Sequence, residues 1–263
     1  MTVSTRAAFA RTVRGKGPGL LLAHGAGGGI DANYGPIMDG LAARHTVVGV
    51  DYPGSGGTPA AQGRIDADDL VDQLIAAADA EGLDTFALSG YSLGGPLAIR
   101  LAARYPERVR ALVLSATFAY ADTRTELVAS IWQQLYEAGQ HTALAAYLNL
   151  MAFGEPALNA LTSDQVRGAT EQLAHTLPAG TPGQVDLVRR IDVRSDLPLI
   201  TAPTLTILTT ADPLVSPALQ RELAAAIPGA EVAEIPTGHL PFVEQPQHWL
   251  KLISSFLERA ATS

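Results

Sequence analysis

The segment Gly90-Tyr91-Ser92-Leu93-Gly94-Gly95 decides the fold of this chain. It lies between an expected strand at residues 85–88 and an expected helix at residues 93–105. A serine in so tight a strand-to-helix turn adopts strained backbone angles, and the glycines on either side let neighbouring chain approach without Cβ clashes. Such a turn pushes the serine hydroxyl out of the sheet. The same pattern also fits an ordinary turn whose serine caps the helix. Other parts of the sequence are therefore needed to distinguish a capping serine from an exposed, reactive one.

The remaining sequence alternates strand and helix patterns. Short apolar runs predict further strands at residues 20–23, 46–50, 110–114, 204–208 and 231–235. Segments with helical periodicity predict helices at residues 32–43, 67–80, 217–227 and 247–260. Several of the apolar runs are hydrophobic on both faces, as parallel strands are when helices cover both sides of a sheet. The chain is therefore predicted to be α/β, with a doubly wound, mostly parallel sheet.

The alternation breaks between residues 119 and 196. This segment shows no strand pattern and reads as three or four amphipathic helices, among them 125–137, 142–151 and 163–177. Because a structureless connection of this length is uncommon in a compact domain, we expect a helical insertion over one edge of the sheet, placed like a lid. The predicted organisation is a core domain made of residues 1–118 and 197–263, with a helical cap of residues 119–196.

The composition excludes several classes of function. With 26 acidic and 18 basic residues the net charge is −8, and no run of lysine or arginine occurs, so we expect neither a nucleic-acid partner nor a membrane surface. Without cysteine there is no thiolate nucleophile, disulfide or Cys-ligated metal. We expect no cofactor and no metal, and a small molecule as substrate. Apolar stretches are too short for a leader or a membrane span, which predicts a cytoplasmic protein of unknown oligomeric state.

An activated serine requires a base and an acid that orients the base. Of the six histidines, His239 follows the last expected strand, so it is predicted at the sheet edge where Ser92 emerges. Asp212 follows the strand at 204–208. An Asp-Pro pair is also a common turn cap, and Asp122 is the reserve candidate for the acid. The chain order of Ser92, Asp212 and His239, each after its own strand, predicts a catalytic triad.

Two backbone amides complete the predicted site. The helix after Ser92 directs its N-terminal amides at the hydroxyl, so the Leu93 N–H is predicted to stabilise an oxyanion. The second donor is expected from His24-Gly25-Ala26-Gly27-Gly28-Gly29, and we assign it to Ala26, with Gly27 as the alternative. This glycine run is similar to a phosphate-binding loop. It lacks both the G-x-G-x-x-G and the Gly-Lys-Ser/Thr patterns, so no nucleotide site is predicted.

Taken together, these motifs resemble those of the α/β-hydrolase superfamily over nearly the whole chain outside the insertion. In that family an H-G-x-x-G loop supplies an oxyanion amide, and residues 24–28 match it, which implies a structural role for His24. The stretch Asp51-Tyr52-Pro53-Gly54-Ser55-Gly56-Gly57-Thr58 resembles the family's D-x-x-G-x-G-x-S/T turn, and it receives no catalytic role. The resemblance implies the α/β-hydrolase fold in a lid-bearing branch with a serine nucleophile.

The predicted reaction is hydrolysis of a small-to-medium, largely apolar ester or lactone through an acyl-enzyme. Ser92 would attack after His239 takes its proton, Asp212 would hold the imidazole, and the amides of Leu93 and Ala26 would receive the negative charge. Since the site loops contain no convergent Arg or Lys, the substrate is expected to be neutral. Large apolar side chains in and beside the insertion could cover a hydrophobic substrate pocket, although no substrate contact is assigned to any one of them. These side chains are Phe118, Tyr120, Trp132, Leu135, Tyr136, Tyr147, Met151 and Phe153.

Three other uses of the same residues stay open, because one scaffold of this superfamily carries many reactions. A lyase would use Ser92 and His239 without an acyl-enzyme, and a G-Y-S-x-G-G turn occurs in a menaquinone-pathway lyase of the superfamily. A small-molecule receptor would retain the triad and turn over slowly or not at all. A peptidase acting on short N-terminal peptides is the third.

Overall fold

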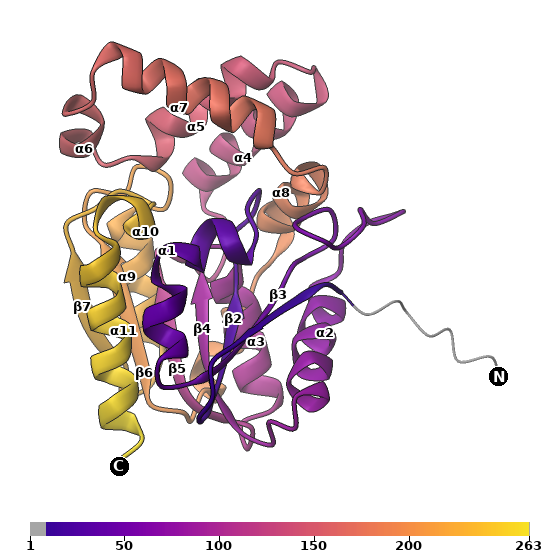
Figure 1. Ribbon diagram of the computed structural model, residues 1–263, viewed down its shortest axis with the longest axis vertical. Helices are drawn as coiled ribbons and strands as arrows, with labels where there is room; N and C mark the ends of the chain where they lie inside the picture. Colours follow the sequence, from indigo (N-terminus) through magenta and orange to yellow (C-terminus); the bar gives the residue numbers. More distant parts are fainter. Residues whose placement is uncertain (1–8, 263) are drawn as a thin grey trace.

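A computed structural model describes residues 9–262 as a seven-stranded sheet with helices on both faces and a helical insertion above it (Figure 1). The strands are β1 (Arg11–Arg14), β2 (Gly19–Ala23), β3 (Thr46–Val50), β4 (Phe86–Tyr91), β5 (Val109–Ser115), β6 (Thr204–Thr209) and β7 (Glu231–Ile235). Their order is β1-β3-β2-β4-β5-β6-β7, with β1 antiparallel to β3 and all other neighbours parallel. The predicted fold class is confirmed.

Two hydrophobic cores lie on the two faces of the sheet. Helices α2 (Ala67–Ala80), α3 (Gly94–Arg104) and α9 (Pro217–Ala226) cover one face, while α1 (Ile30–Ala42) and α11 (Pro246–Ala260) cover the other. Successive residues of a strand point to opposite faces, so Leu21 enters the first core while Leu20 and Leu22 enter the second. Both faces are therefore buried, which explains why these strands are apolar throughout.

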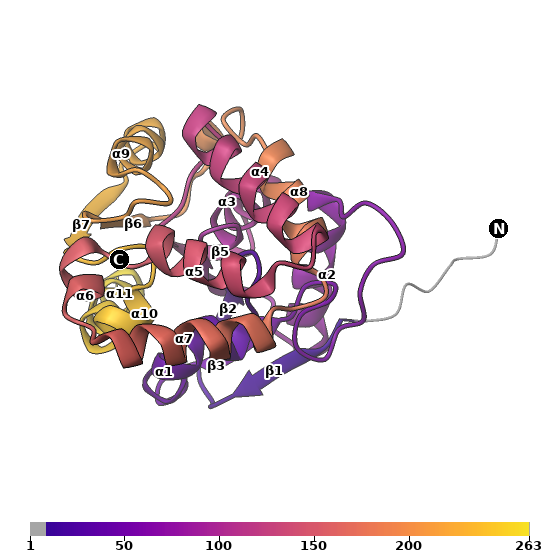
Figure 2. The ribbon, with the colours of Figure 1, turned by 90° about the horizontal axis from the view of Figure 1, so that it is seen from above.

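The helical insertion lies between β5 and β6. It consists of α4 (Thr123–Glu137), α5 (His141–Ala152), α6 (Glu155–Asn159), α7 (Ser163–Thr176) and α8 (Thr181–Arg190), five helices where three or four were expected. Seen from above, α4, α5 and α7 extend over the ends of the sheet strands (Figure 2). In the described part of the chain, no helix has the length and apolar character that a membrane crossing requires.

Elements that the sequence pattern missed are short or weakly apolar. Strand β1 has four residues and exposed arginines at both ends, so it shows no apolar run, and its place at the sheet edge is set by antiparallel pairing with β3. Helices α6 and α10 (Pro241–Glu244) have five and four residues, less than two turns, and carry too little periodicity to detect. In the ten-residue α8, polar residues and glycine are mixed with the few buried apolar side chains.

The topology brings separate parts of the chain to one edge of the sheet. Strands β2, β4, β6 and β7 are parallel neighbours or near neighbours, so the loops that follow them all emerge beneath the insertion. These loops hold the glycine run after β2, Ser92 after β4, Asp212 after β6 and His239 after β7. The carboxyl edge of such a sheet is where α/β proteins place ligands.

Candidate active site

Ser92 lies in the turn between β4 and α3, with φ of 51°. This left-handed conformation costs a residue other than glycine about 1–3 kcal/mol. A Cβ atom at Gly90 would lie 2.5 Å from the carbonyl oxygen of Gly94, and one at Gly94 would lie 2.0 Å from that of Ala23, so both positions require glycine. The residue preceding α3 is Leu93, and no side chain among residues 9–262 caps this helix. Ser92 is therefore not an ordinary capping serine.

The structure brings Ser92, His239 and Asp212 into one hydrogen-bonded chain. Nε2 of His239 lies 2.9 Å from Oγ of Ser92, and Nδ1 of His239 lies 2.8 Å from Oδ2 of Asp212. All three residues are buried, with exposed fractions of 7% for Ser92 and 4% for each of the others. Since a carboxylate only accepts hydrogen bonds, it selects the tautomer with the proton on Nδ1. Nε2 is then free to accept the proton of Ser92.

The Asp212 carboxylate performs two tasks at once. Its Oδ1 accepts hydrogen bonds from the amides of Leu214 and Val215, both at 2.9 Å, as a turn-capping aspartate does. Its Oδ2 accepts from the Thr209 hydroxyl at 2.8 Å in addition to His239. Gln220 donates to Thr209 and to the Val215 carbonyl oxygen, each at 2.8 Å, and closes the network. The two interpretations of the Asp-Pro pair, turn cap and histidine partner, therefore apply together.

The reserve candidate for the acid lies elsewhere. Asp122 is the N-cap of α4, and its side chain accepts a hydrogen bond from the Thr125 amide at 2.8 Å. Helix capping accounts for this carboxylate. Among the other histidines, His45, His141, His175 and His248 line neither of the two cavities described below.

The loop that carries His239 is tied to both the sheet and the insertion. The Tyr91 hydroxyl donates to the His239 carbonyl oxygen at 2.9 Å, and the His239 amide donates to the carbonyl oxygen of Ala152, at the end of α5, at 2.7 Å. Oε1 of Glu244 accepts from the amides of Gly154 and Gly238 at 3.1 and 3.0 Å. Burial raises the pKa of Glu244, and the two amides oppose that rise. Glu244 thus joins the α5–α6 junction to the residue before His239.

Replacing Glu244 with alanine is expected to lower kcat by about 10- to 100-fold, because a small displacement of the loop that carries His239 would move its imidazole out of line with Ser92. Glu244→Gln retains the accepting Oε1 and should preserve most of the activity. Steady-state kinetics on a p-nitrophenyl ester would compare the two variants, with KM expected to change less than kcat. Equal losses in both variants would show that the charge, rather than the two amide contacts, matters.

The glycine loop after β2 lines the large cavity, and two of its backbone amides are bound within the protein. The Gly25 N–H donates to Asn33 Oδ1 and the Gly27 N–H donates to Gln184 Oε1, both at 2.9 Å. In the part of the chain that the structure describes, the Ala26 and Leu93 amides donate to no other residue. The Gly27 amide is thus already bound, whereas the two amides assigned from the sequence have no internal partner.

Gln184 of α8 fastens the insertion to this loop. Its side chain is fully buried, and besides accepting from Gly27 it donates to the Pro53 carbonyl oxygen at 3.1 Å and to the Ser55 hydroxyl at 2.9 Å. The turn similar to D-x-x-G-x-G-x-S/T is therefore connected to the glycine loop through an insertion residue. Neither Gln184 nor Glu244 was identified from the sequence, because both act on residues remote from them along the chain.

His24 is a buried structural histidine. Its Nε2 accepts from the Tyr52 amide at 3.0 Å, and its Nδ1 donates to the Gly25 carbonyl oxygen at 2.8 Å. Burial lowers the pKa of His24 from 6.5 to about 4, an effect that the Gly25 carbonyl and Asp51 partly oppose. At neutral pH the imidazole is therefore uncharged, with one nitrogen donating and the other accepting.

The free energy of unfolding should fall as the pH drops from about 6.5 to about 4. The unfolded chain takes up a proton at its ordinary histidine pKa while the folded protein does not, so low pH favours unfolding, by up to about 3 kcal/mol for a shift of this size. Urea unfolding of the wild type and of His24→Gln across this range would isolate the effect from carboxylate titrations. A parallel pH dependence in the two proteins would contradict it.

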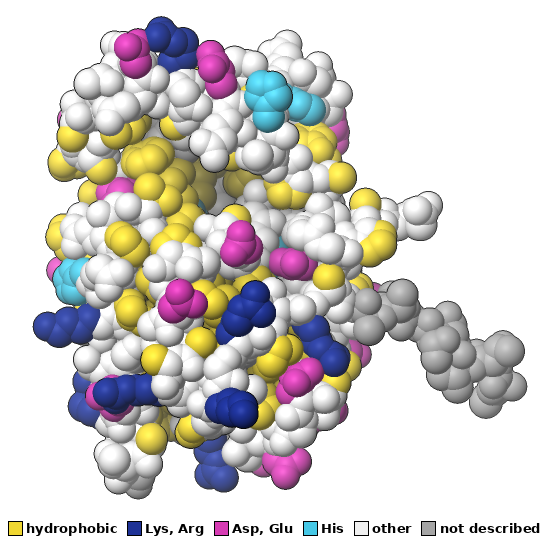
Figure 3. Space-filling model, in the orientation of Figure 1, with side chains coloured by type: hydrophobic (Ala, Val, Ile, Leu, Met, Phe, Trp, Pro, Cys, Tyr) yellow, Lys and Arg dark blue, Asp and Glu magenta, His cyan; other side chains and the backbone are white. Residues whose placement is uncertain are grey.

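Two cavities border Ser92. The larger, of about 420 Å³, lies between the sheet edge and helices α5 and α7, and its walls include His239, Leu148, Phe153 and Leu173. The smaller, of about 30 Å³, lies between α4 and α8. Figure 3 shows hydrophobic surface gathered in the hollow between the insertion and the body of the molecule.

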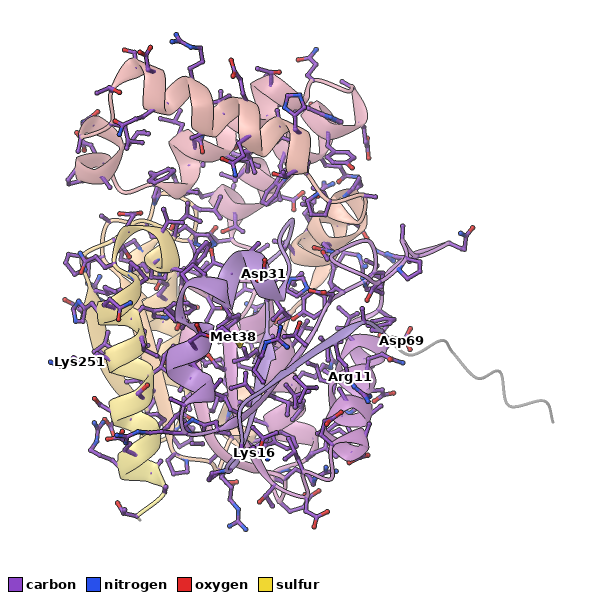
Figure 4. The ribbon with its side chains drawn as sticks, in the orientation of Figure 1. Arg11, Lys16, Asp31, Met38, Asp69 and Lys251 are labelled. Atoms are coloured by element: carbon purple, nitrogen blue, oxygen red, sulfur yellow. The ribbon has the colours of Figure 1, made fainter. Side chains whose placement is uncertain are left out.

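The walls of both cavities are uncharged. Apart from the histidine of the site, the described lining residues include no acidic or basic side chain. The two lysines of the chain, Lys16 and Lys251, lie on the body of the molecule, away from the hollow (Figure 4). From the pool of apolar side chains noted in the sequence, Trp132 lines both cavities, Phe153 the larger and Phe118 the smaller, and the other five line neither.

Comparisons with known proteins agree with this architecture. A family model described as the alpha/beta hydrolase fold matches residues 18–246. A pyrrolizixenacetamide deacetylase of Xenorhabdus hominickii is 34% identical over 247 residues, covering 93% of this chain and 92% of that protein. A pimeloyl-(acyl-carrier protein) methyl ester esterase of Chromobacterium violaceum is 31% identical over 259 residues, covering 94% of this chain and 97% of that protein.

A solved structure shows the same fold. The crystal structure of an enol-lactonase from Burkholderia xenovorans matches with a TM-score of 0.85 at 23% sequence identity, covering 96% of this chain and 99% of that one. At this identity the likeness concerns the fold. Because the family model spans most of the sequence and relatives above 30% identity align over nearly their whole length, the chain belongs to the α/β-hydrolase fold family.

Proposed function

We propose that the protein is a serine hydrolase that cleaves a neutral, small-to-medium ester or lactone through an acyl-enzyme. The observation that carries the proposal is the chain of hydrogen bonds from Asp212 through His239 to Ser92, which ends at an uncharged cavity. A serine hydroxyl bonded to a histidine that is oriented by a buried carboxylate is the arrangement that activates serine for acyl transfer.

The mechanism follows from the hydrogen-bond directions. His239 Nε2 takes the hydroxyl proton as Ser92 Oγ bonds to the carbonyl carbon, and the carbonyl oxygen becomes an oxyanion held by the Ala26 and Leu93 amides. The bond to the leaving group then breaks, and the leaving oxygen takes the proton from Nε2. Water attacks the acyl-enzyme, gives a proton to His239, and the proton returns to Ser92 as the acid departs.

A second candidate is hydrolysis of an acetamide. It is favoured by the 34% identical relative, described as a deacetylase, whose sequence aligns over 93% of this chain. The same triad would serve, with a leaving amine in place of an alcohol. Amide cleavage makes a greater demand on His239, because an amine leaves only when it is protonated.

We further propose that residues 119–196 act as a cap over the core formed by residues 1–118 and 197–263. Gln184, Ala152 and Gly154 each connect this segment to a loop of the site. The cap would then shape the large cavity. It would also help to hold in position the glycine loop after β2, here called the oxyanion loop, and the loop that carries His239.

Trapping of the acyl-enzyme tests the proposed function. Intact-mass analysis after mixing with p-nitrophenyl acetate at low pH should reveal one acetyl group, located on Ser92 by peptide mapping. N-acetyl p-nitroaniline measured in parallel separates amide from ester cleavage. Saturable ester binding with neither acylation nor turnover would contradict hydrolysis and favour a receptor, and turnover without an adduct in rapid-quench samples would favour a lyase.

A further inference from the structure

The small cavity is a built apolar pocket beside the nucleophile. Helix α4 lines it with Thr125, Val128, Ala129 and Trp132, which lie on one face of the helix at spacings of three and four residues. Val185 and Val188 of α8 form the facing wall. Ser92 and Thr125 supply the hydroxyl groups, and the other described lining residues are hydrophobic. The pocket can therefore hold a short hydrocarbon group.

Trp132 separates this pocket from the large cavity. It lines both, and its ring lies against the oxyanion loop, since a Cβ atom at Gly27 would lie 2.6 Å from Trp132 Cζ2. Within residues 9–262, the Trp132 indole nitrogen has no hydrogen-bond partner. The ring is thus held by packing alone, and truncating it breaks no internal hydrogen bond.

The position of the base decides which end of a substrate enters which cavity. Ser92 and Ala26 border both cavities, whereas His239 borders only the larger. In acyl transfer the leaving group takes its proton from the base, so it has to lie on the His239 side of the attacked carbon. The leaving group is thereby assigned to the large cavity, and the acyl chain to the pocket between α4 and α8.

The volumes then set the sizes of the two groups. The small pocket, of about 30 Å³, has less than a tenth of the volume of the large cavity, so it has room for a short acyl group and not for a long chain. The cavity of about 420 Å³ falls in the range typical of sites for drug-sized ligands. A short acyl group and a much larger neutral leaving group match these two spaces.

We propose that the pocket between α4 and α8 is an acyl subsite that restricts the enzyme to acetyl and propionyl groups, and that Trp132 is the wall that sets this limit. The inference rests on the proposed function, since it takes Ser92 and His239 as nucleophile and base. It adds a substrate class: acetyl or propionyl derivatives of a larger, uncharged alcohol or amine.

A chain-length series tests the assignment. With p-nitrophenol as the constant leaving group, wild-type kcat/KM is expected to fall at least about tenfold from propionate to hexanoate, because methylenes that the pocket cannot hold lose their binding or clash. In Trp132→Ala the ratio of hexanoate to acetate should rise at least about tenfold, since the wall between the two cavities is removed. The matched control is Leu127→Ala on the same helix, where the side chain is 60% exposed and lines neither cavity. It should retain the wild-type profile.

A second variant acts in the opposite direction and does not depend on the fold tolerating the loss of a tryptophan. Ala129→Val adds two methyl groups to the pocket wall and should lower kcat/KM for propionate more than for acetate. The acyl assignment is overturned if wild-type kcat/KM stays level or rises from acetate to hexanoate. It is also overturned if the ratio of propionate to acetate kcat/KM is the same in Ala129→Val as in the wild type.

The experiments distinguish failure of the acyl subsite from failure of the hydrolase function. Turnover that depends on Ser92 but shows a flat chain-length profile overturns the acyl subsite and leaves the hydrolase intact. Absence of Ser92-dependent turnover with every ester of the series overturns both. An increase in hexanoate hydrolysis in Leu127→Ala equal to that in Trp132→Ala would also overturn the wall assignment, because the effect would then come from a general loosening of α4.

Discussion

Replacing Ser92 with alanine is expected to lower kcat/KM for neutral p-nitrophenyl esters by about 10⁴- to 10⁶-fold. Within residues 9–262, Ser92 is the only residue that both lies within hydrogen-bond distance of His239 Nε2, at 2.9 Å, and borders both cavities. In the proposed mechanism no acyl-enzyme would form without it, and the remaining acceleration would come from the proposed oxyanion amides and from substrate binding. Rates measured at high enzyme concentration, together with labelling by a fluorophosphonate, would quantify the loss.

Ser92→Gly is the matched control for the backbone strain at this position. It should be as inactive as Ser92→Ala but more stable towards urea, because glycine adopts the φ of 51° without strain while alanine does not. Comparing the two separates the chemical contribution of the hydroxyl from the conformational cost of the turn. Ester turnover in either variant within tenfold of the wild type would refute Ser92 as the nucleophile.

Asp212→Asn is expected to lower kcat by about 10⁴-fold with little loss of folded structure. The retained oxygen can still accept from the Leu214 and Val215 amides, while the new NH₂ group faces Nδ1 of His239. An NH₂ donor there favours the tautomer with the proton on Nε2, which cannot accept the proton of Ser92. The loss should therefore appear in kcat more than in KM.

Asp122→Asn carries the same chemical change at the other candidate acid. Asparagine caps helices about as well as aspartate, so both activity and unfolding midpoint should stay close to those of the wild type. Thermal unfolding and steady-state kinetics of the two variants, measured side by side, test the assignment. A loss of activity in Asp122→Asn as large as that in Asp212→Asn would contradict it.

The parts of the fold that could be predicted were those that depend on patterns among residues close together in the sequence. Six of the seven strands were located because a buried parallel strand is apolar on both faces, and the edge strand β1 was missed because it is not. The turn at Ser92 was recognisable since the steric demand that creates it falls on glycines two positions away on either side. Ser92, Asp212 and His239 could be proposed as a triad because each lies in the loop that follows a strand.

The supporting contacts could not be predicted from local patterns. Gln184 meets the Gly27 amide 157 residues away along the chain, and Glu244 meets the Gly154 amide 90 residues away. The residues next to a glutamine or glutamate on a helix do not indicate whether its side chain will be buried against a loop from a distant part of the chain. The division of the site into two unequal cavities likewise depends on how α4, α5, α7 and α8 settle over the sheet.

The sequence by itself determined the α/β architecture, the strained serine turn and the residues available for the site, because backbone sterics and hydrophobic periodicity act between near neighbours. Only the tertiary structure decided which carboxylate contacts His239, that the Gly27 amide is bound internally, and that two cavities of unequal size border Ser92. These depend on distances of a few ångströms between segments far apart in the chain, and such distances are set by packing.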